Sequence, residues 1–135
     1  MDQYGLTFIP PVLLVRTGQP VEFRNSDDTL HNVRVREDTG AGAFNVALPF
    51  DGTYVHTFEH DGFYVVGCDI HAAMSAEIVA TSTPYVVVAD PDGAFTFSDV
   101  KPGSYTATAY AGVRRIQRPI EVTGPRTEVS VDVEQ

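Results

Sequence analysis

The chain consists largely of short runs of β-branched and aromatic residues that end at turns rich in glycine, proline and aspartate. Almost none of it has the three- to four-residue apolar periodicity of an amphipathic helix. Strands are predicted over 12–16, 21–25, 33–36, 54–58, 63–67 and 76–80, and then over 85–89, 94–98, 105–110, 114–122 and 127–133. This pattern predicts an all-β protein.

Two connections in the first half are predicted from their turn residues. Residues 37–52 contain several glycines and the pair Asp51-Gly52, so they are expected to form a loop that crosses between sheets, with Phe44 and residues 46–50 anchored to the core. The pair Asp61-Gly62 is expected to make a tight hairpin turn between the runs 54–58 and 63–67.

The sequence changes character after residues 81–84, where threonine, serine and proline cluster. The expected organisation is a domain over 1–82 followed by a smaller β segment over 83–135. About 50 residues lie at the low end of what folds independently, so this segment is expected to pack on the larger part.

Potential metal ligands gather in one short stretch. Cys68 is the only cysteine, His71 follows three residues later and Met74 three residues after that. Copper that alternates between two oxidation states favours a thiolate, two imidazoles and a weak axial thioether. His31 is the candidate for the second imidazole. Since Cys68 shares strand parity with Tyr64 and Val66, its sulfur is expected to be buried at one end of a sandwich.

Charge and composition exclude several classes of protein. The formal net charge of −9 argues against nucleic-acid binding and fits a basic protein partner or simple solubility. No apolar run is long enough for a membrane helix. The start of the sequence lacks the features of a secretory signal, so an exported protein would be represented here by its mature form. A single cysteine rules out an internal disulfide.

The first part of the chain resembles the cupredoxins. The resemblance rests on the stretches 8–12, 15–25 and 62–68, on His31-Asn32-Val33, and on the order of His31, Cys68, His71 and Met74. It covers residues 4–81, and the short gap between His71 and Met74 is similar to that of the amicyanins. The resemblance implies a Greek-key β-sandwich, one type 1 copper ion, blue or green, held by those four residues, and one-electron transfer to a redox protein partner in the periplasm or outside the cell.

The second part resembles a different family. Residues 88–97 and 100–105 look like the carboxypeptidase regulatory-like, or transthyretin-like, β-sandwich module. The opening strands of that module are missing here, and the last cupredoxin strand, 76–80, is expected to substitute for them. An appended small β-sandwich is therefore predicted.

Further residues have predicted roles of their own. Asn32 is expected either to fix the ligand loop by hydrogen bonds or to be an ordinary turn residue. Pro10, Pro11, Ala72 and Ala73 are expected to form an apolar surface where a partner docks.

Other residues that resemble metal ligands are given structural roles. His56 is expected to be a packed or solvated histidine and His60 a turn residue, neither with a metal role. Asp90 and Asp92 are attributed to turn formation rather than to calcium binding.

Two alternatives to an electron carrier stay open. The same site would also suit copper tolerance or delivery, without a dedicated electron partner. The chain would also suit an adhesion or scaffold module in which copper is secondary. An enzyme is not expected, because the two histidines left after His31 and His71 are too few for a second, catalytic copper centre.

Overall fold

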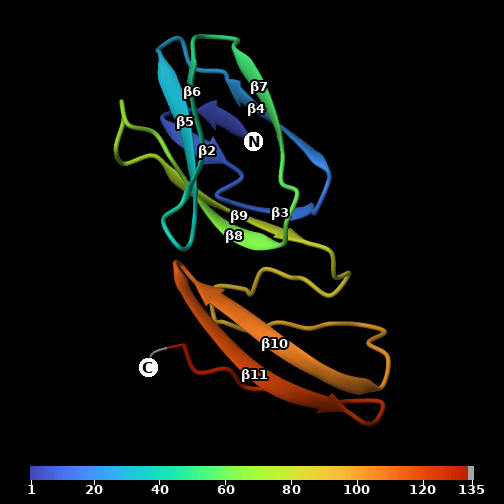
Figure 1. The fold of residues 1–135 in the computed structure, drawn as a ribbon. Coiled ribbons are helices and arrows are strands. Elements are labelled where there is room, and N and C mark those ends of the chain that lie inside the picture. The colour runs from blue at the N-terminus through green and yellow to red at the C-terminus, as the bar shows by residue number, and fades with distance from the viewer. Residues whose placement is uncertain (134–135) are drawn as a thin grey trace. The chain divides into compact units, whose positions relative to one another are not determined.

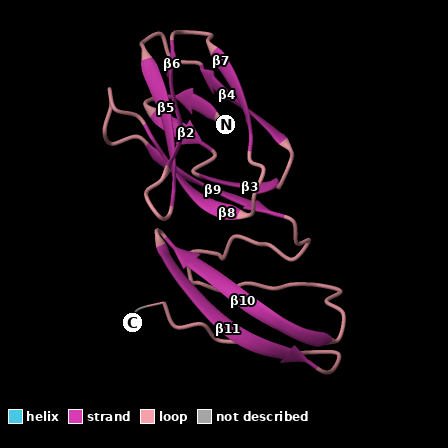
Figure 2. Ribbon diagram, viewed as in Figure 1, coloured by secondary structure: helices cyan, strands magenta, loops and turns pink. Residues whose placement is uncertain are grey.

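A computed structural model describes residues 1–133 of the chain. It confirms the all-β prediction, and Figure 2 shows strands and loops with no helix in this range. The strands are β1 (Asp2–Tyr4), β2 (Thr7–Ile9), β3 (Val12–Arg16), β4 (Pro20–Asn25), β5 (His31–Glu37), β6 (Gly42–Leu48), β7 (Thr53–Thr57), β8 (Gly62–Gly67), β9 (Ser75–Thr81), β10 (Gly103–Ala111) and β11 (Arg114–Val122). No membrane-spanning helix is found among residues 1–133.

The first compact unit, Met1–Val86, contains two sheets (Figure 1). One has the strand order β2-β1-β4-β7 and the other the order β3-β9-β8-β5-β6. Most neighbours are antiparallel, but β1 pairs with β4 and β3 with β9 in parallel. Strands that are distant in sequence therefore lie side by side, and β5 and β8 become neighbours in the centre of the larger sheet.

The core of this unit follows from side-chain alternation along the strands. In β4, Val21 and Phe23 are buried while Glu22 and Arg24 are exposed, as the two-residue period of a strand requires. In β9, Ala76, Ile78 and Ala80 are buried in the same way. Cys68 and Met74 belong to the same buried cluster, so the predicted ligand loop is anchored in the core.

The prediction of an extended loop over residues 37–52 is wrong for its central part. Residues Gly42–Leu48 form β6, which pairs with β5 in antiparallel register from His31↔Leu48 onward. Phe44, Val46 and Leu48 face inward while Ala43, Asn45 and Ala47 are exposed. This alternation outweighs the glycines, which lie at the ends of the segment.

The predicted hairpin at Asp61-Gly62 is also wrong. Strand β7 pairs with β4 in one sheet, whereas β8 pairs with β5 and β9 in the other, so the connection crosses the sandwich. The Asp61 carboxylate accepts hydrogen bonds from the hydroxyls of Thr17, at 2.6 Å, and Ser82, at 2.8 Å. These bonds lower the pKa of Asp61 and fix the connection to other segments rather than to its own flanking strands.

The second compact unit begins at Val87, and its regular structure within the described residues is the antiparallel hairpin β10–β11. The runs 85–89, 94–98 and 127–133 are not strands, contrary to prediction, because β-branched composition alone does not supply a ladder of partner hydrogen bonds. Asp90 forms a turn, and its carboxylate accepts the N–H groups of Asp92 at 3.0 Å and Ala94 at 2.8 Å. This matches the turn role predicted for Asp90.

Candidate metal centre

Three potential ligands converge from two neighbouring strands. His31 opens β5, Cys68 directly follows β8, and His71 lies in the loop that joins β8 to β9. The Nδ1 atoms of the two histidines are 3.0 Å apart, and Cys68 Sγ is 3.8 Å from His31 Nδ1. One nitrogen or sulfur atom from each residue lies within 4.8 Å of those of the other two. Among residues 1–133, these three side chains form the one cluster of histidine, cysteine or acidic residues that is close enough to hold a metal ion.

The separation of Cys68 Sγ and His31 Nδ1 fits a single bound metal ion. Bonds of about 2.0 Å to nitrogen and about 2.3 Å to sulfur in a trigonal set place neighbouring donor atoms roughly 3.5 to 3.8 Å apart. The 3.8 Å sulfur–nitrogen distance agrees with that range, and the shorter 3.0 Å distance involves His71, whose ring is only partly buried. One thiol and two imidazoles, two of these three side chains being buried, are the donors that favour copper.

The candidate ligands differ in their access to solvent. The side chain of His31 is fully buried, and Cys68 and Met74 are each 2% exposed. His71 is intermediate, while its neighbours Ala72 and Ala73 are exposed. The ring of His71 is therefore the part of the group that reaches the surface.

The loop from Cys68 to Met74 is closed by its own backbone. The N–H of Met74 donates to the carbonyl of His71 at 2.9 Å, and the N–H of Cys68 donates to the carbonyl of Met74 at 3.4 Å. Strand pairing resumes immediately outside the loop at Gly67↔Ser75. These bonds confine His71 and Met74 to a short, defined turn beside Cys68.

Asn32 joins β5 to the same loop. Its side-chain oxygen accepts the backbone N–H of Asp69 at 2.6 Å and that of Ile70 at 3.3 Å, and lies 3.3 Å from Cys68 Sγ. Its amide nitrogen donates to the Asp69 carboxylate at 3.0 Å and to Asn45 at 2.9 Å. The residue therefore connects two strands and the ligand loop through one buried amide.

The Asp69 carboxylate completes this network. It accepts the Asn45 side-chain amide at 3.3 Å and pairs with the Arg34 guanidinium. Arg34 lies on β5 and Asn45 opposite it on β6, so the residue after Cys68 is fixed to both strands. Asp69 could not be singled out from the sequence, because an aspartate next to Cys68 is equally expected of an ordinary turn.

Asp27 holds the other side of His31. Its Oδ2 lies 2.8 Å from His31 Nε2, and its side chain is 13% exposed. The hydrogen bond to His31 holds the pKa of Asp27 below its ordinary value, and the N–H groups of Leu6 and Gly5 contribute in the same direction. Sequence analysis missed Asp27 as well, because only the fold shows which side of the ring it faces.

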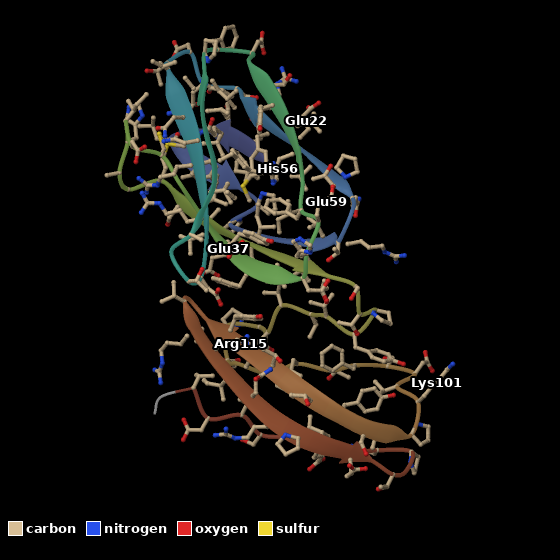
Figure 3. All side chains as sticks on the ribbon, in the orientation of Figure 1. Glu22, Glu37, His56, Glu59, Lys101 and Arg115 are labelled. Carbon is tan, nitrogen blue, oxygen red and sulfur yellow. The ribbon has the colours of Figure 1, made fainter. Side chains whose placement is uncertain are left out.

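The other two histidines lie outside the metal-ligating group. The ring of His56, which is labelled in Figure 3, packs against those of Phe44, at 4.5 Å between centroids, and Phe58, at 4.8 Å. Burial lowers the pKa of His56, although the charge of Glu59 acts in the opposite direction. His60 is exposed, and its backbone carbonyl accepts the Tyr64 hydroxyl. Both match the structural roles predicted for them.

The predicted docking residues are at least partly accessible. Ala72, Ala73 and Pro11 are exposed and Pro10 is half-buried. The carbonyl of Pro11 accepts the N–H of Glu77 at 2.9 Å, which places Pro11 beside the start of β9, just after the ligand loop.

Comparison with known protein families gives one match. The family described as polysaccharide lyase family 4, domain II matches residues 40–129. The chain belongs to this family. The part of this domain II chain that matches runs from the turn before β6 past the end of β11, and it includes Cys68, His71 and Met74 but not His31. No curated protein matches the chain.

Solved structures similar to this domain II chain include amicyanin variants and a cupredoxin. An oxidised amicyanin variant is 27% identical with a TM-score of 0.53, and a Cu(I) form of another amicyanin variant is 25% identical with a TM-score of 0.51. Each match covers 59% of this chain and 78% of the other. A purple cupredoxin from Nitrosopumilus maritimus is 25% identical over 53% of this chain and 79% of that one, with a TM-score of 0.49. The amicyanin matches confirm the predicted cupredoxin fold.

Proposed function

We propose that this protein is a mononuclear type 1 copper protein that carries one electron at a time. The observation that carries the proposal is the convergence of His31 Nδ1, Cys68 Sγ and His71 Nδ1 on one small volume. The likeness to an amicyanin solved in its Cu(I) form supports the choice of metal. Addition of one equivalent of Cu(II) to the apoprotein tests it, and an intense thiolate-to-copper charge-transfer band is the expected result.

Met74 completes the proposed ligand set as a weak axial donor. Its burial and its backbone bonds to His71 and Cys68 support this role, since they hold Met74 in the core next to these two residues. Bound copper supplies a one-electron couple between Cu(II) and Cu(I). A soft thioether with two imidazoles and a thiolate is a compromise between the preferences of the two oxidation states.

The residues around the ligands limit rearrangement when the electron arrives or leaves. His31 is fixed by Asp27, and the loop is fixed by Asn32 and by the Asp69 network. The core excludes water from Cys68 and Met74. A site that is held rigid by its surroundings in both states exchanges electrons with little reorganisation.

The proposed point of electron entry and exit is the partly exposed edge of His71. Ala72 and Ala73 flank it on the surface, and Pro11 lies beside the neighbouring strand. We propose that this apolar rim, with Pro10, meets a redox protein in brief encounters, and that the net charge of −9 favours a basic partner. The proposed location is the periplasm or the cell exterior, where such carriers act.

Replacing Ala72 by Glu is expected to slow electron self-exchange between two copies of the copper-loaded protein. Two like charges would meet at the docking rim, so the rate should fall roughly tenfold at low ionic strength and recover with salt. Line broadening in nuclear magnetic resonance spectra of mixed oxidised and reduced protein measures the rate. The copper absorption spectrum should stay unchanged.

Thr39→Glu is the matched control. Thr39 is exposed in the turn between β5 and β6, at the opposite end of β5 from His31, and it receives the same charge. Equal slowing by both variants would refute the docking rim, because it would mean that total charge alone controls the encounter. Self-exchange that is slow already in the wild type would favour copper tolerance or delivery over electron transport.

We also propose a separate role for the second part of the chain. We take residues 1–82 as the copper domain and residues 83–135 as a carboxypeptidase regulatory-like segment. The Asp90 turn and the hairpin β10–β11 support this proposal. The matched family is described as a domain of polysaccharide lyases, and its match over residues 40–129 includes most of this segment. An adhesion or scaffold role is therefore the second candidate function. If the Cys68→Ala variant bound the same polysaccharides or proteins as the wild type, this second function would be favoured.

A further inference from the structure

We propose that Asp27 is the residue that positions His31 toward the metal and sets the reduction potential of the site. This inference rests on the proposed copper function and goes beyond it, because it assigns a role to a residue that is not a ligand. Its carboxylate oxygen Oδ2 lies 2.8 Å from Nε2 of the fully buried His31 ring.

The hydrogen bond decides which nitrogen of His31 faces the metal. A carboxylate only accepts hydrogen bonds, so the proton of the neutral ring resides on Nε2. The lone pair is then on Nδ1, the atom that lies 3.0 Å from His71 Nδ1 and 3.8 Å from Cys68 Sγ. Asp27 thus prepares the ring for coordination, as a carboxylate does for the histidine ligands of other metal sites.

Asp27 is itself held rigidly by the hairpin between β1 and β2. Its Oδ1 accepts the N–H of Gly5 at 2.7 Å, and its Oδ2 accepts the N–H of Leu6 at 3.0 Å. Gly5 and Leu6 are the two loop residues of that hairpin and have φ angles of 62° and 58°. Positive φ at both positions makes a type I′ turn and is uncommon for a leucine. The turn thereby presents two adjacent N–H groups to one carboxylate.

The charge of Asp27 should favour the more highly charged copper ion. A carboxylate bonded to the far nitrogen makes the imidazole a better donor, and the gain is larger for Cu(II) than for Cu(I). Removing that charge while keeping an acceptor is therefore expected to weaken Cu(II) binding by about ten- to hundredfold. Cu(I) binding should weaken less. Each tenfold difference between the two raises the reduction potential by about 59 mV.

The test compares Asp27→Asn with Asp28→Asn. The first substitution keeps one side-chain oxygen to accept Nε2–H but loses the charge, whereas Asp28 is exposed and its change removes the same charge one residue away. Voltammetry of the copper-loaded proteins and chelator competition for each oxidation state are the measurements. A rise in potential in Asp27→Asn, with much less in Asp28→Asn, is the expected result. Equal shifts in both, or none in either, would overturn the proposal.

Nitrogen-15 spectra of the apoprotein test the positioning role without copper. The wild type should show His31 with its proton on Nε2, and Asp27→Ala should lose that preference. A proton on Nδ1 in the wild type would overturn the proposal. If Asp27→Asn does not fold, Asp27→Glu is measured instead. Glutamate keeps the negative charge, so the reduction potential should stay near that of the wild type. A large change in potential would show that the charge does not set it.

Copper spectra separate failure of the proposed function from failure of this inference. Absence of a thiolate-to-copper band in the loaded wild type would reject the copper site itself. The His31 tautomer in the apoprotein would still decide whether Asp27 orients the ring.

Discussion

Cys68→Ser is expected to reduce Cu(I) affinity by more than about 100-fold. Removing a residue that only hydrogen-bonds to a metal ligand costs up to about 100-fold, and losing the ligand itself should cost more. A hydroxyl oxygen is a poor substitute for a soft thiolate toward Cu(I). Cys68 is 2% exposed, and serine is nearly the same size, so the fold should survive the exchange. Competition with a chromophoric Cu(I) chelator gives the affinity.

Two controls separate metal binding from folding in this experiment. The free energy of unfolding of the apoprotein should fall by only about 1 kcal/mol, the usual net effect of a single changed hydrogen-bonding group. His60→Ala removes an exposed histidine outside the group and should leave the affinity at the wild-type value. Cu(I) binding by Cys68→Ser as tight as that of the wild type would show that the thiolate is not a ligand.

Asn32→Ala is expected to lower the free energy of unfolding of the apoprotein by about 2 kcal/mol. The buried amide of Asn32 satisfies the N–H groups of Asp69 and Ile70 and donates to the Asp69 carboxylate, and alanine would remove all of these partners at once. Chemical denaturation measures the stability. Amide hydrogen exchange at Asp69 and Ile70 should accelerate more than exchange within β9.

Asn45→Ala provides the comparison for this network. Asn45 is exposed and makes two bonds in this network, as acceptor of the Asn32 amide at 2.9 Å and as donor to the Asp69 carboxylate at 3.3 Å. Its loss leaves the Asn32 bonds to the ligand loop in place, so it should lower the free energy of unfolding by less, about 1 kcal/mol. If the two variants were equally stable, the Asn32 amide would not be what fixes the ligand loop to β5.

Much of the fold could be predicted because strand signals in this chain are local. Val21 and Phe23 alternate with charged residues, and β4 formed where that alternation predicted it. The segment 37–52 misled because its glycines obscured the alternation of Phe44, Val46 and Leu48. In the second unit, β-rich runs without pairing partners did not form strands, since pairing is a property of the whole sheet rather than of one segment.

The ligands and their surroundings differ in how far the sequence reveals them. Cys68, His71 and Met74 are close in sequence, and their donor chemistry alone indicates a metal loop. Asp27 and Asp69 carry no comparable signal, because aspartate is common in turns. Only the pairing of β5 with β8 and the β1–β2 hairpin bring these carboxylates to His31 and Asn32.

The most direct test of the central claim is the spectrum of the wild-type protein during titration with Cu(II). The account predicts an intense visible charge-transfer band that saturates at one copper per chain, and an electron paramagnetic resonance spectrum with the small copper hyperfine splitting of a thiolate-bound type 1 site. A weak band with the wide splitting of a site built only from nitrogen and oxygen, unchanged in Cys68→Ser, would contradict it.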